Sequence, residues 1–355
     1  MKFPTEALVS IAKHLDIHAA VVTTARAQKL FCRAPIDCPL GTVSRTCPGG
    51  ICIVRAFALA SILVVLLIAG CSTPSGDPAP HLTREAAIAW ARGIDPCALV
   101  DRGALASLGP ITTVGTSGRS TACEAALEDT AASWSLILQS NEFHVGSQVR
   151  IDGVTVRKVD AAELLPPLQR YMLIRRTCSY DVPFENSIAV RVQVTAPLEQ
   201  DACGMGRPLV RSVLANWPKH PAQGSSPDTT LTPLTDALPC AAVPALKESH
   251  RVVMAVADQT LNTCVFTVEG AKVEIRFGYR DRDEAGSAAR PATFGPHSGS
   301  VEVSDGGALA RVEMGSAFTG VQAGPRRLVP SVDVRGDDAA TVSVVMAEAV
   351  GQIRH

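Results

Sequence analysis

The most constraining feature of the sequence is a set of six cysteines with nearly regular spacing, at positions 97, 123, 178, 203, 240 and 264. Taken in order, they form pairs separated by 26, 25 and 24 residues. An even number of cysteines is typical of disulfides in an exported chain, whereas cysteines in a reducing compartment are free thiols or metal ligands. No C-x-x-C motif occurs among these six, which disfavours a metal site. The choice between disulfides and buried free thiols therefore depends on where the chain resides.

The stretch LVVLLIAGCSTPSGD (63–77) addresses that question. The run Ala56–Gly70 contains no charged residue, and its length suits the apolar region of a signal segment better than a membrane span of about 20 residues. Ile68-Ala69-Gly70-Cys71 has the pattern of a lipobox, in which the cysteine receives diacylglycerol and palmitate. A buried core helix and an uncleaved signal anchor are the alternatives. We expect Cys71 to be lipidated and to become the first residue of the mature protein.

The distribution of charge agrees with export of the segment after Cys71. Residues 1–55 hold seven Lys/Arg and three Asp/Glu, whereas the whole chain has a net charge of −1. Positive residues before an apolar segment stay in the cytoplasm. Because 1–55 is long for a signal sequence, it is either cytoplasmic or an extension upstream of the true start, with Val43 and Val54 as candidate starts. Its four cysteines are too irregularly spaced for a zinc knuckle, at positions 32, 38, 47 and 52.

Composition divides the exported part further. We expect a signal region and lipobox at 56–71, a tether with an entry helix at 72–93, a first domain at 94–217, a linker at 218–237 and a second domain at 238–355. The tether STPSGDPAP and the linker PKHPAQGSSPDTTLTPLTDA are rich in Pro, Ser and Thr. The linker isolates the last cysteine pair, so we expect the sequential pairing Cys97–Cys123, Cys178–Cys203 and Cys240–Cys264. Each loop of about 25 residues would contribute about 3.5 kcal/mol in the chain-entropy account.

The two long segments resemble each other in the order of their patterns. Each opens with Pro-Cys and a helix-like stretch, and each continues with a cysteine-led strand, CEAALE (123–128) or CVFTVE (264–269). The next strands, SWSLILQ and KVEIRFGY, alternate apolar and polar residues as half-buried antiparallel strands do. Asp-Gly hairpins follow at 149–156 and 301–313, and helices close the segments at 206–217 and 340–353.

This order predicts an α+β fold with two similar domains, each an antiparallel sheet with helices packed on one face and stapled by disulfides. Only the first segment has a second cysteine pair, Cys178 and Cys203. If these two form a disulfide, a copy without one of them is expected to lack the other as well, because a single cysteine would have no partner. Superposing the closing helices places the counterpart of Cys203 near Asp337. Chance similarity of two unrelated domains is the alternative.

The D-P-C-x-L opening at 95–99, the cysteine-led strand and the D-A-C at 201–203, downstream of a lipobox, resemble a family of actinobacterial secreted lipoproteins that share a domain of unknown function. They are also distantly similar to the extracellular sensor domains of mycobacterial Ser/Thr kinases. The resemblance covers 94–217 well and 238–355 more thinly. It implies an envelope location and a disulfide-stapled α+β fold, and it provides no catalytic residues.

Motifs that carry chemistry are scarce. The sequence contains no H-E-x-x-H, no P-loop and no G-x-S-x-G motif. GMG at 204–206 suits a helix entry better than a phosphate loop, and His297 beside Ser298 suits an ordinary loop better than a nucleophile pair. The tryptophans at 90, 134 and 217 suit packing better than sugar binding. We expect no catalytic residue, no metal and no cofactor.

The sequence thus favours a lipid-anchored module that binds, senses or scaffolds on the outer face of the cytoplasmic membrane. Its expected partners are the membrane, through Cys71, and an envelope protein or small ligand; the low net charge excludes a nucleic-acid partner. The alternative is an envelope hydrolase or transferase whose site has no linear motif. The duplicated scaffold predicts a ligand cleft at the junction of the two copies, and the linker composition predicts that this cleft is adjustable.

Overall fold

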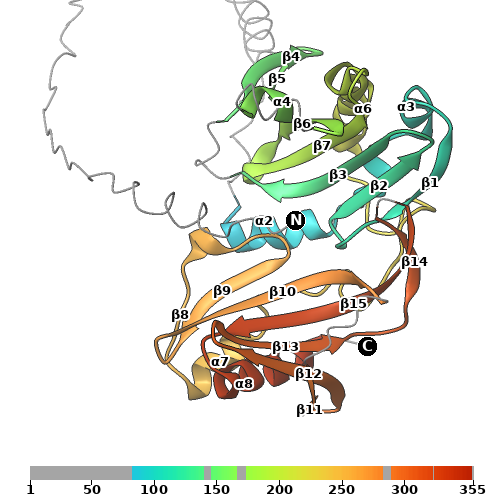
Figure 1. Cartoon of the computed structure of the whole chain (residues 1–355). Helices are drawn as coiled ribbons and strands as arrows, with labels where there is room; N and C mark the ends of the chain where they lie inside the picture. Colours follow the sequence, from blue (N-terminus) through green and yellow to red (C-terminus); the bar gives the residue numbers. More distant parts are fainter. Residues whose placement is uncertain (1–81, 140–144, 166–172, 283–288, 323, 354–355) are drawn as a thin grey trace, which may run out of the picture. The chain divides into compact units, whose positions relative to one another are not determined.

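The computed structural model describes residues 82–139, 145–165, 173–282, 289–322 and 324–353 (Figure 1). Gly76–His355 forms one compact unit, and the statements below concern its described part. Two antiparallel sheets with helices on one face of each make up this unit, which confirms the α+β class. The tether, Ala56–Gly70 and Cys71 lie outside the described residues. Within the described ranges, no helix is both long enough and apolar enough to cross a membrane.

The first sheet has the strand order β1-β2-β3-β7-β6-β5-β4. Its strands are β1 (Ile111–Thr116), β2 (Ala122–Leu127), β3 (Ala131–Leu138), β4 (Ser147–Ile151), β5 (Val154–Asp160), β6 (Arg175–Pro183) and β7 (Ile188–Pro197). The helical elements of this part are α2 (Arg84–Arg92), a 3-10 turn at Cys97–Leu99, α3 (Arg102–Ala106), α4 (Ala161–Leu164) and α6 (Ala202–Asn216). The long helix α6 packs across β6 and β7 and buries one face of the sheet (Figure 1).

The second sheet has the order β11-β12-β13-β15-β10-β9-β8, and β14 also pairs with β15. Its strands are β8 (Val252–Val253), β9 (Thr263–Val268), β10 (Ala271–Asp281), β11 (Arg290–Phe294), β12 (His297–Ser304), β13 (Gly307–Glu313), β14 (Phe318–Val321) and β15 (Pro325–Gly336). Its helices are α7 (Val243–Ser249) and α8 (Ala339–Gly351). The helix α8 packs on β13 and β15, so one face of this sheet is covered as well (Figure 1).

Side-chain alternation explains why these segments are strands. Val273, Ile275, Phe277 and Tyr279 are all buried on the helix side of β10, as their spacing predicts. The Asp-Gly pairs also end strands as expected: Asp152 and Gly153 have positive φ values of 48° and 85° in the turn between β4 and β5. The helix-like stretch after the first Pro-Cys consists of two short elements, the 3-10 turn and α3, with Asp101 at the start of α3.

In the described part of the chain, three disulfides link strands of the two sheets to segments outside the sheets. The bonds Cys97–Cys123, Cys178–Cys203 and Cys240–Cys264 are formed, with Cα–Cα distances of 5.1, 5.1 and 5.2 Å. The first links the 3-10 turn to β2, the second links β6 to α6, and the third links the entry of α7 to β9. The sequential pairing expected from the spacing is confirmed.

The linker 218–237 is held by hydrogen bonds to both parts of the unit, in contrast to the adjustable spacing that its composition suggested. The backbone NH of Asp95 donates to Pro221 O at 2.8 Å, and the NH of Thr230 donates to Thr116 Oγ1 at 2.8 Å. Leu234 is buried in the core of the second sheet. Proline and threonine therefore shape this segment without making it a free spacer.

Arg92, the last residue of α2, ties the two parts together. Its side chain is 2% exposed and donates to Leu261 O at 2.7 Å, to Asn262 Oδ1 at 3.0 Å and to the carbonyl oxygens of Leu234 and Thr235. Burial lowers the pKa of Arg92 to about 10, so the side chain is still charged at neutral pH. A buried cation is thus solvated by carbonyl dipoles that belong to the linker and to the second half.

Candidate functional site

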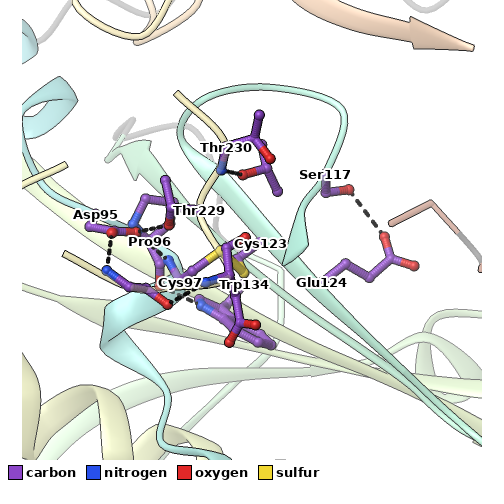
Figure 2. The surroundings of a disulfide bond; sticks show 12 residues. Asp95, Pro96, Cys97, Ser117, Cys123, Glu124, Trp134, Thr229 and Thr230 are labelled. Atoms are coloured by element: carbon purple, nitrogen blue, oxygen red, sulfur yellow. Dashed lines mark hydrogen bonds between the residues drawn. A yellow bond between two sulfur atoms is a disulfide. The ribbon is translucent and has the colours of Figure 1, made fainter. Parts of the chain in front are cut away.

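The D-P-C opening, the most specific motif of the folded part, serves a structural purpose. Figure 2 shows Asp95, Pro96 and Cys97 beside the disulfide to Cys123. Asp95 is fully buried, and its carboxylate accepts hydrogen bonds from the NH groups of Cys97 and Ser226 and from the hydroxyl of Thr229. The linker is therefore fixed to the first sheet by the first residue of the motif.

The next residue of the motif anchors the core. Trp134 Nε1 donates to Pro96 O at 2.6 Å, so the indole is both buried and satisfied (Figure 2). Trp217 is buried too and stacks on Phe184 with ring centroids 4.0 Å apart, and Trp90 meets its edge at 5.8 Å. All three tryptophans are packing residues, in agreement with the sequence interpretation.

The other sequence candidates lie apart from one another. GMG falls in the first turns of α6, where Gly206 is needed because a Cβ there would lie 2.8 Å from the Tyr180 ring. His297 and Ser298 begin β12 after a Gly-Pro turn. His220 contacts Glu185 at 3.2 Å and His250 contacts Glu269 at 3.9 Å, both near the surface. Among the described residues, no group of three or more His, Cys, Asp or Glu is arranged to hold a metal ion.

The structure instead presents a large cleft that no sequence motif indicated. It has a volume of about 1130 Å³ and lies against the helix-free face of the first sheet, with β10 and residues 257–263 of the second half on its other side. Ligand pockets commonly have volumes of roughly 300–1000 Å³, so a small molecule would fit with room to spare. The cleft lies at the junction of the two halves, where the sequence placed it.

Strand alternation makes this cleft polar and positively charged. In β7, Val190, Val192 and Val194 point into the core, and Arg191 between them faces the cleft. Among the described residues, five arginines but only two carboxylates, Glu124 and Asp181, line the cleft; the arginines are Arg84, Arg119, Arg157, Arg191 and Arg276. This imbalance favours a negatively charged occupant.

One row of cross-strand neighbours forms the floor of the cleft. Ser135, Arg191, Asp181 and Arg157 lie side by side on β3, β7, β6 and β5. Arg191 donates to the Asp181 carboxylate through Nε at 2.7 Å and through Nη2 at 3.1 Å. Arg157 donates to the same carboxylate. Burial would raise the pKa of Asp181, but hydrogen bonds from Arg191 and Arg157 and their charges hold it below its usual value. The carboxylate of Asp181 therefore stays charged and paired with both arginines at neutral pH.

Arg119 differs from the other arginines of the cleft. It stands in the turn between β1 and β2, its side chain is exposed, and its guanidinium forms no hydrogen bond or ion pair with any described residue, whereas its backbone oxygen accepts from the NH of Ala122. Desolvation by the surrounding protein lowers its pKa, and the positive charges of Arg191 and Arg276 lower it further. Arg276 is itself paired with Glu274 at 2.6 Å. Three arginines of one cleft thus influence one another electrostatically, and Arg119 has no counter-charge of its own among the described residues.

Sequence reasoning missed this site because its residues are dispersed over more than 150 positions and form no motif. A usable indication was present in VRVQV (190–194) and in VEIRFGY (273–279), where arginine occupies the polar positions of alternating strands. That pattern places Arg191 and Arg276 on helix-free faces. It does not reveal that the two faces meet.

Comparison with protein-family models, with curated proteins and with solved structures found no match to this chain. The resemblance to actinobacterial lipoproteins and kinase sensor domains therefore stays a prediction, and the function has to be argued from the cleft and from the sequence itself.

Proposed function

We propose that the protein is an envelope lipoprotein, anchored through a lipid on Cys71 to the outer face of the cytoplasmic membrane, whose folded part binds a ligand without catalysing a reaction. The observation that carries the binding role is the cleft of about 1130 Å³ between the two halves. Its floor consists of side chains already held by ion pairs, and such preorganisation favours binding because little side-chain freedom is lost. The lipobox and the charge distribution support the anchoring.

A second part of the proposal is that the two halves are copies of one fold. Read from one edge, the first sheet runs β1-β2-β3-β7-β6-β5-β4, and the second runs β8-β9-β10-β15-β13-β12-β11. If the strands correspond in this order, β14 is an insertion in the second copy. Both closing helices begin after an aspartate, Asp201 or Asp338, and pack on corresponding strands. This correspondence supports a duplication.

The alignment implied by the sheet order differs from the sequence alignment at one hairpin. The sequence pairs the Asp-Gly hairpin at 149–156 with that at 301–313. The sheet order pairs the first with the β11–β12 hairpin, since β12 and β13 take the places of β5 and β6. Register then makes Ala308 the counterpart of Cys178, and the helix starts make Ala340 the counterpart of Cys203, three residues beyond the expected Asp337.

Obstruction of the cleft tests the binding role. The full chain is extracted from membranes, mixed with the small molecules released from the same envelope and analysed by native mass spectrometry. We expect a bound mass on the wild type that is missing from Ser135→Trp, which fills the cleft floor, and present on Ser304→Trp, an exposed site outside the cleft lining. Equal occupancy of all three proteins, or none, contradicts the proposal. Turnover of the bound molecule supports the hydrolase or transferase alternative instead.

The anchoring is tested separately with Cys71→Ala. We expect this variant to leave the membrane fraction or to accumulate unprocessed. Unchanged fractionation and unchanged migration of the variant would contradict lipidation.

A further inference from the structure

Two independent observations indicate which ligand the cleft selects. The first is that Arg119, Arg191 and Arg276 line the same cleft, although they come from a turn of the first half, from β7 and from β10. Like charges repel at short range, and a cleft with low-dielectric walls strengthens the repulsion. A bound anion would remove this repulsion, and the binding of that anion is correspondingly favoured.

The second observation is a set of donors without acceptors. Gln259 lines the cleft and is 1% exposed, and its Nε2 has no hydrogen-bond partner within the described part of the chain. Arg84 lies beside it, because Arg84 donates to Gln259 O at 2.6 Å, and the buried Nε of Arg84 also has no partner in that part. An unsatisfied buried donor costs about 1–3 kcal/mol, so native proteins rarely leave one without a reason.

The other residues that line the cleft indicate the class of ligand. Hydroxyl and amide side chains line the walls together with apolar ones; among the former are Ser133, Ser135, Gln148, Asn262 and Thr263. The hydroxyl and amide groups can form hydrogen bonds with an oxygen-rich part of a ligand, and the apolar residues can pack against the rest of it. Several guanidinium groups in one cleft suit an anion with several acceptor oxygens, because arginine binds phosphate with two parallel hydrogen bonds.

We propose that the cleft binds a small phosphate-bearing molecule, with the phosphoryl group held by Arg119, Arg191 and Arg276. The Gln259 amide, whose Nε2 is shielded from solvent in this structure, would turn toward the cleft and donate to an oxygen of the same ligand. This inference rests on the proposed binding function and specifies its ligand. Arg119 is the residue whose charge the ligand would neutralise, because Arg191 and Arg276 already have Asp181 and Glu274. The phosphate could belong to a soluble ester or to a lipid headgroup at the membrane surface.

The experiment titrates the full chain with inorganic pyrophosphate, with citrate as a non-phosphate anion, and with vesicles of phosphatidylcholine alone or mixed with phosphatidylglycerol. Calorimetry reports the binding of the soluble probes and co-sedimentation reports that of the vesicles. The variants are Arg119→Gln and Arg276→Gln. The control is Arg335→Gln, an exposed arginine of β15 outside the cleft lining.

We expect pyrophosphate to bind more tightly than citrate, to bind more weakly as salt is added, and to lose at least about tenfold in affinity in each cleft variant, as the loss of a hydrogen bond to a charged group predicts. The control should change by less than about twofold. Preference for phosphatidylglycerol vesicles over pyrophosphate, with the same dependence on Arg119, identifies a lipid headgroup as the source of the phosphate.

Preference for citrate, or affinities that Arg119→Gln leaves unchanged, would overturn the assignment. If Ser135→Trp still abolishes a ligand from the envelope extract while Arg119→Gln does not weaken it, the binding role stands and the phosphate is wrong. If no ligand depends on Ser135, the binding role itself fails.

Discussion

Asp95 shows how much of this fold depends on single buried polar groups. Its carboxylate oxygens accept from two backbone NH groups and two hydroxyls, and three of these donors belong to the linker (Figure 2). Removal of the carboxylate would leave the buried NH of Cys97 and the part-buried linker donors without this acceptor. The D-P-C motif therefore has a structural role: it attaches the linker to the first half. It contributes no residue to the lining of the cleft.

The first prediction follows directly. Asp95→Ala should lower the free energy of unfolding by about 3 kcal/mol, because bonds to a charged group contribute about 1.5–3 kcal/mol and several are lost together. Urea denaturation followed by tryptophan fluorescence measures the change. Asp129→Ala, at an exposed position, should stay within about 0.5 kcal/mol of the wild type. Equal midpoints for the two variants would show that this attachment contributes nothing.

A second residue-scale prediction concerns acid. Burial would raise the pKa of Asp160, but the hydrogen bonds from Arg176 and from the NH of Ala162, with the nearby positive charge, hold it below its usual value. A carboxylate with a depressed native pKa stabilises the fold above its unfolded pKa of about 3.9 and stops doing so as the pH falls through the native pKa. Wild-type stability should therefore decline steeply below about pH 4.

Asp160→Asn is the matched test of this dependence. The variant should be less stable at pH 7 and should lose less stability than the wild type between neutral and acidic pH. Urea midpoints at several pH values measure both. Parallel pH profiles would place the acid sensitivity elsewhere, for instance at Asp181 in the cleft.

Individual strands were predictable, whereas their neighbours were not. The period of two in KVEIRFGY determines which residues of β10 are buried, and it does so without any knowledge of the partners. The pairing of β3 with β7, or of β10 with β15, joins segments about 55 residues apart, and no local pattern encodes it. The pairing of the two Asp-Gly hairpins differs from the sheet order for the same reason. An Asp-Gly pair indicates a turn, but it does not indicate which position in the sheet the adjoining strands take.

The element-scale prediction transfers a disulfide. If the halves are copies, Ala308→Cys with Ala340→Cys occupies the places of Cys178 and Cys203 and should form a bond. The chain-entropy account gives a gain of about 3 kcal/mol for loops of this size, less any strain. Peptide mapping without reduction detects the link. Arg335→Cys with Ala340→Cys, which places one thiol on the opposite face of the sheet, should stay reduced; free thiols in both variants would argue against the correspondence.

At the scale of the whole molecule, the two halves behave as one body because polar groups cross between them. Arg92 reaches the carbonyls of Leu234 and Leu261, Asn262 Nδ2 donates to Thr121 Oγ1 at 2.7 Å, and the NH of Tyr279 donates to Gly118 O at 2.8 Å. The composition of the linker suggested an adjustable segment. Its proline and threonine content gives no information about the tertiary hydrogen bonds that hold it in place. The cleft could be anticipated at this junction, but its arginine lining could not.

The corresponding prediction is a change of cooperativity. Calorimetry of the wild type should show a single unfolding transition for residues after the tether. Arg92→Ala leaves several buried carbonyls unsatisfied and should lower stability by about 3 kcal/mol and split the transition into two. Arg102→Ala removes an ion pair of a side chain that is 60% exposed, and it should cost less than about 1 kcal/mol. A single sharp transition in Arg92→Ala would mean that other contacts join the halves.

The order of the disulfides has a consequence for biogenesis. In the described part of the chain, each disulfide joins two cysteines that are consecutive among the cysteines of the sequence. No disulfide loop therefore contains a cysteine of another disulfide. A chain that emerges N-terminus first presents Cys97 and Cys123 before Cys178 appears, and so on to Cys264. An oxidase that joins cysteines in order of arrival would thus reach the native set without rearrangement. Maturation of this protein should tolerate the loss of a disulfide isomerase while it remains dependent on a thiol oxidase.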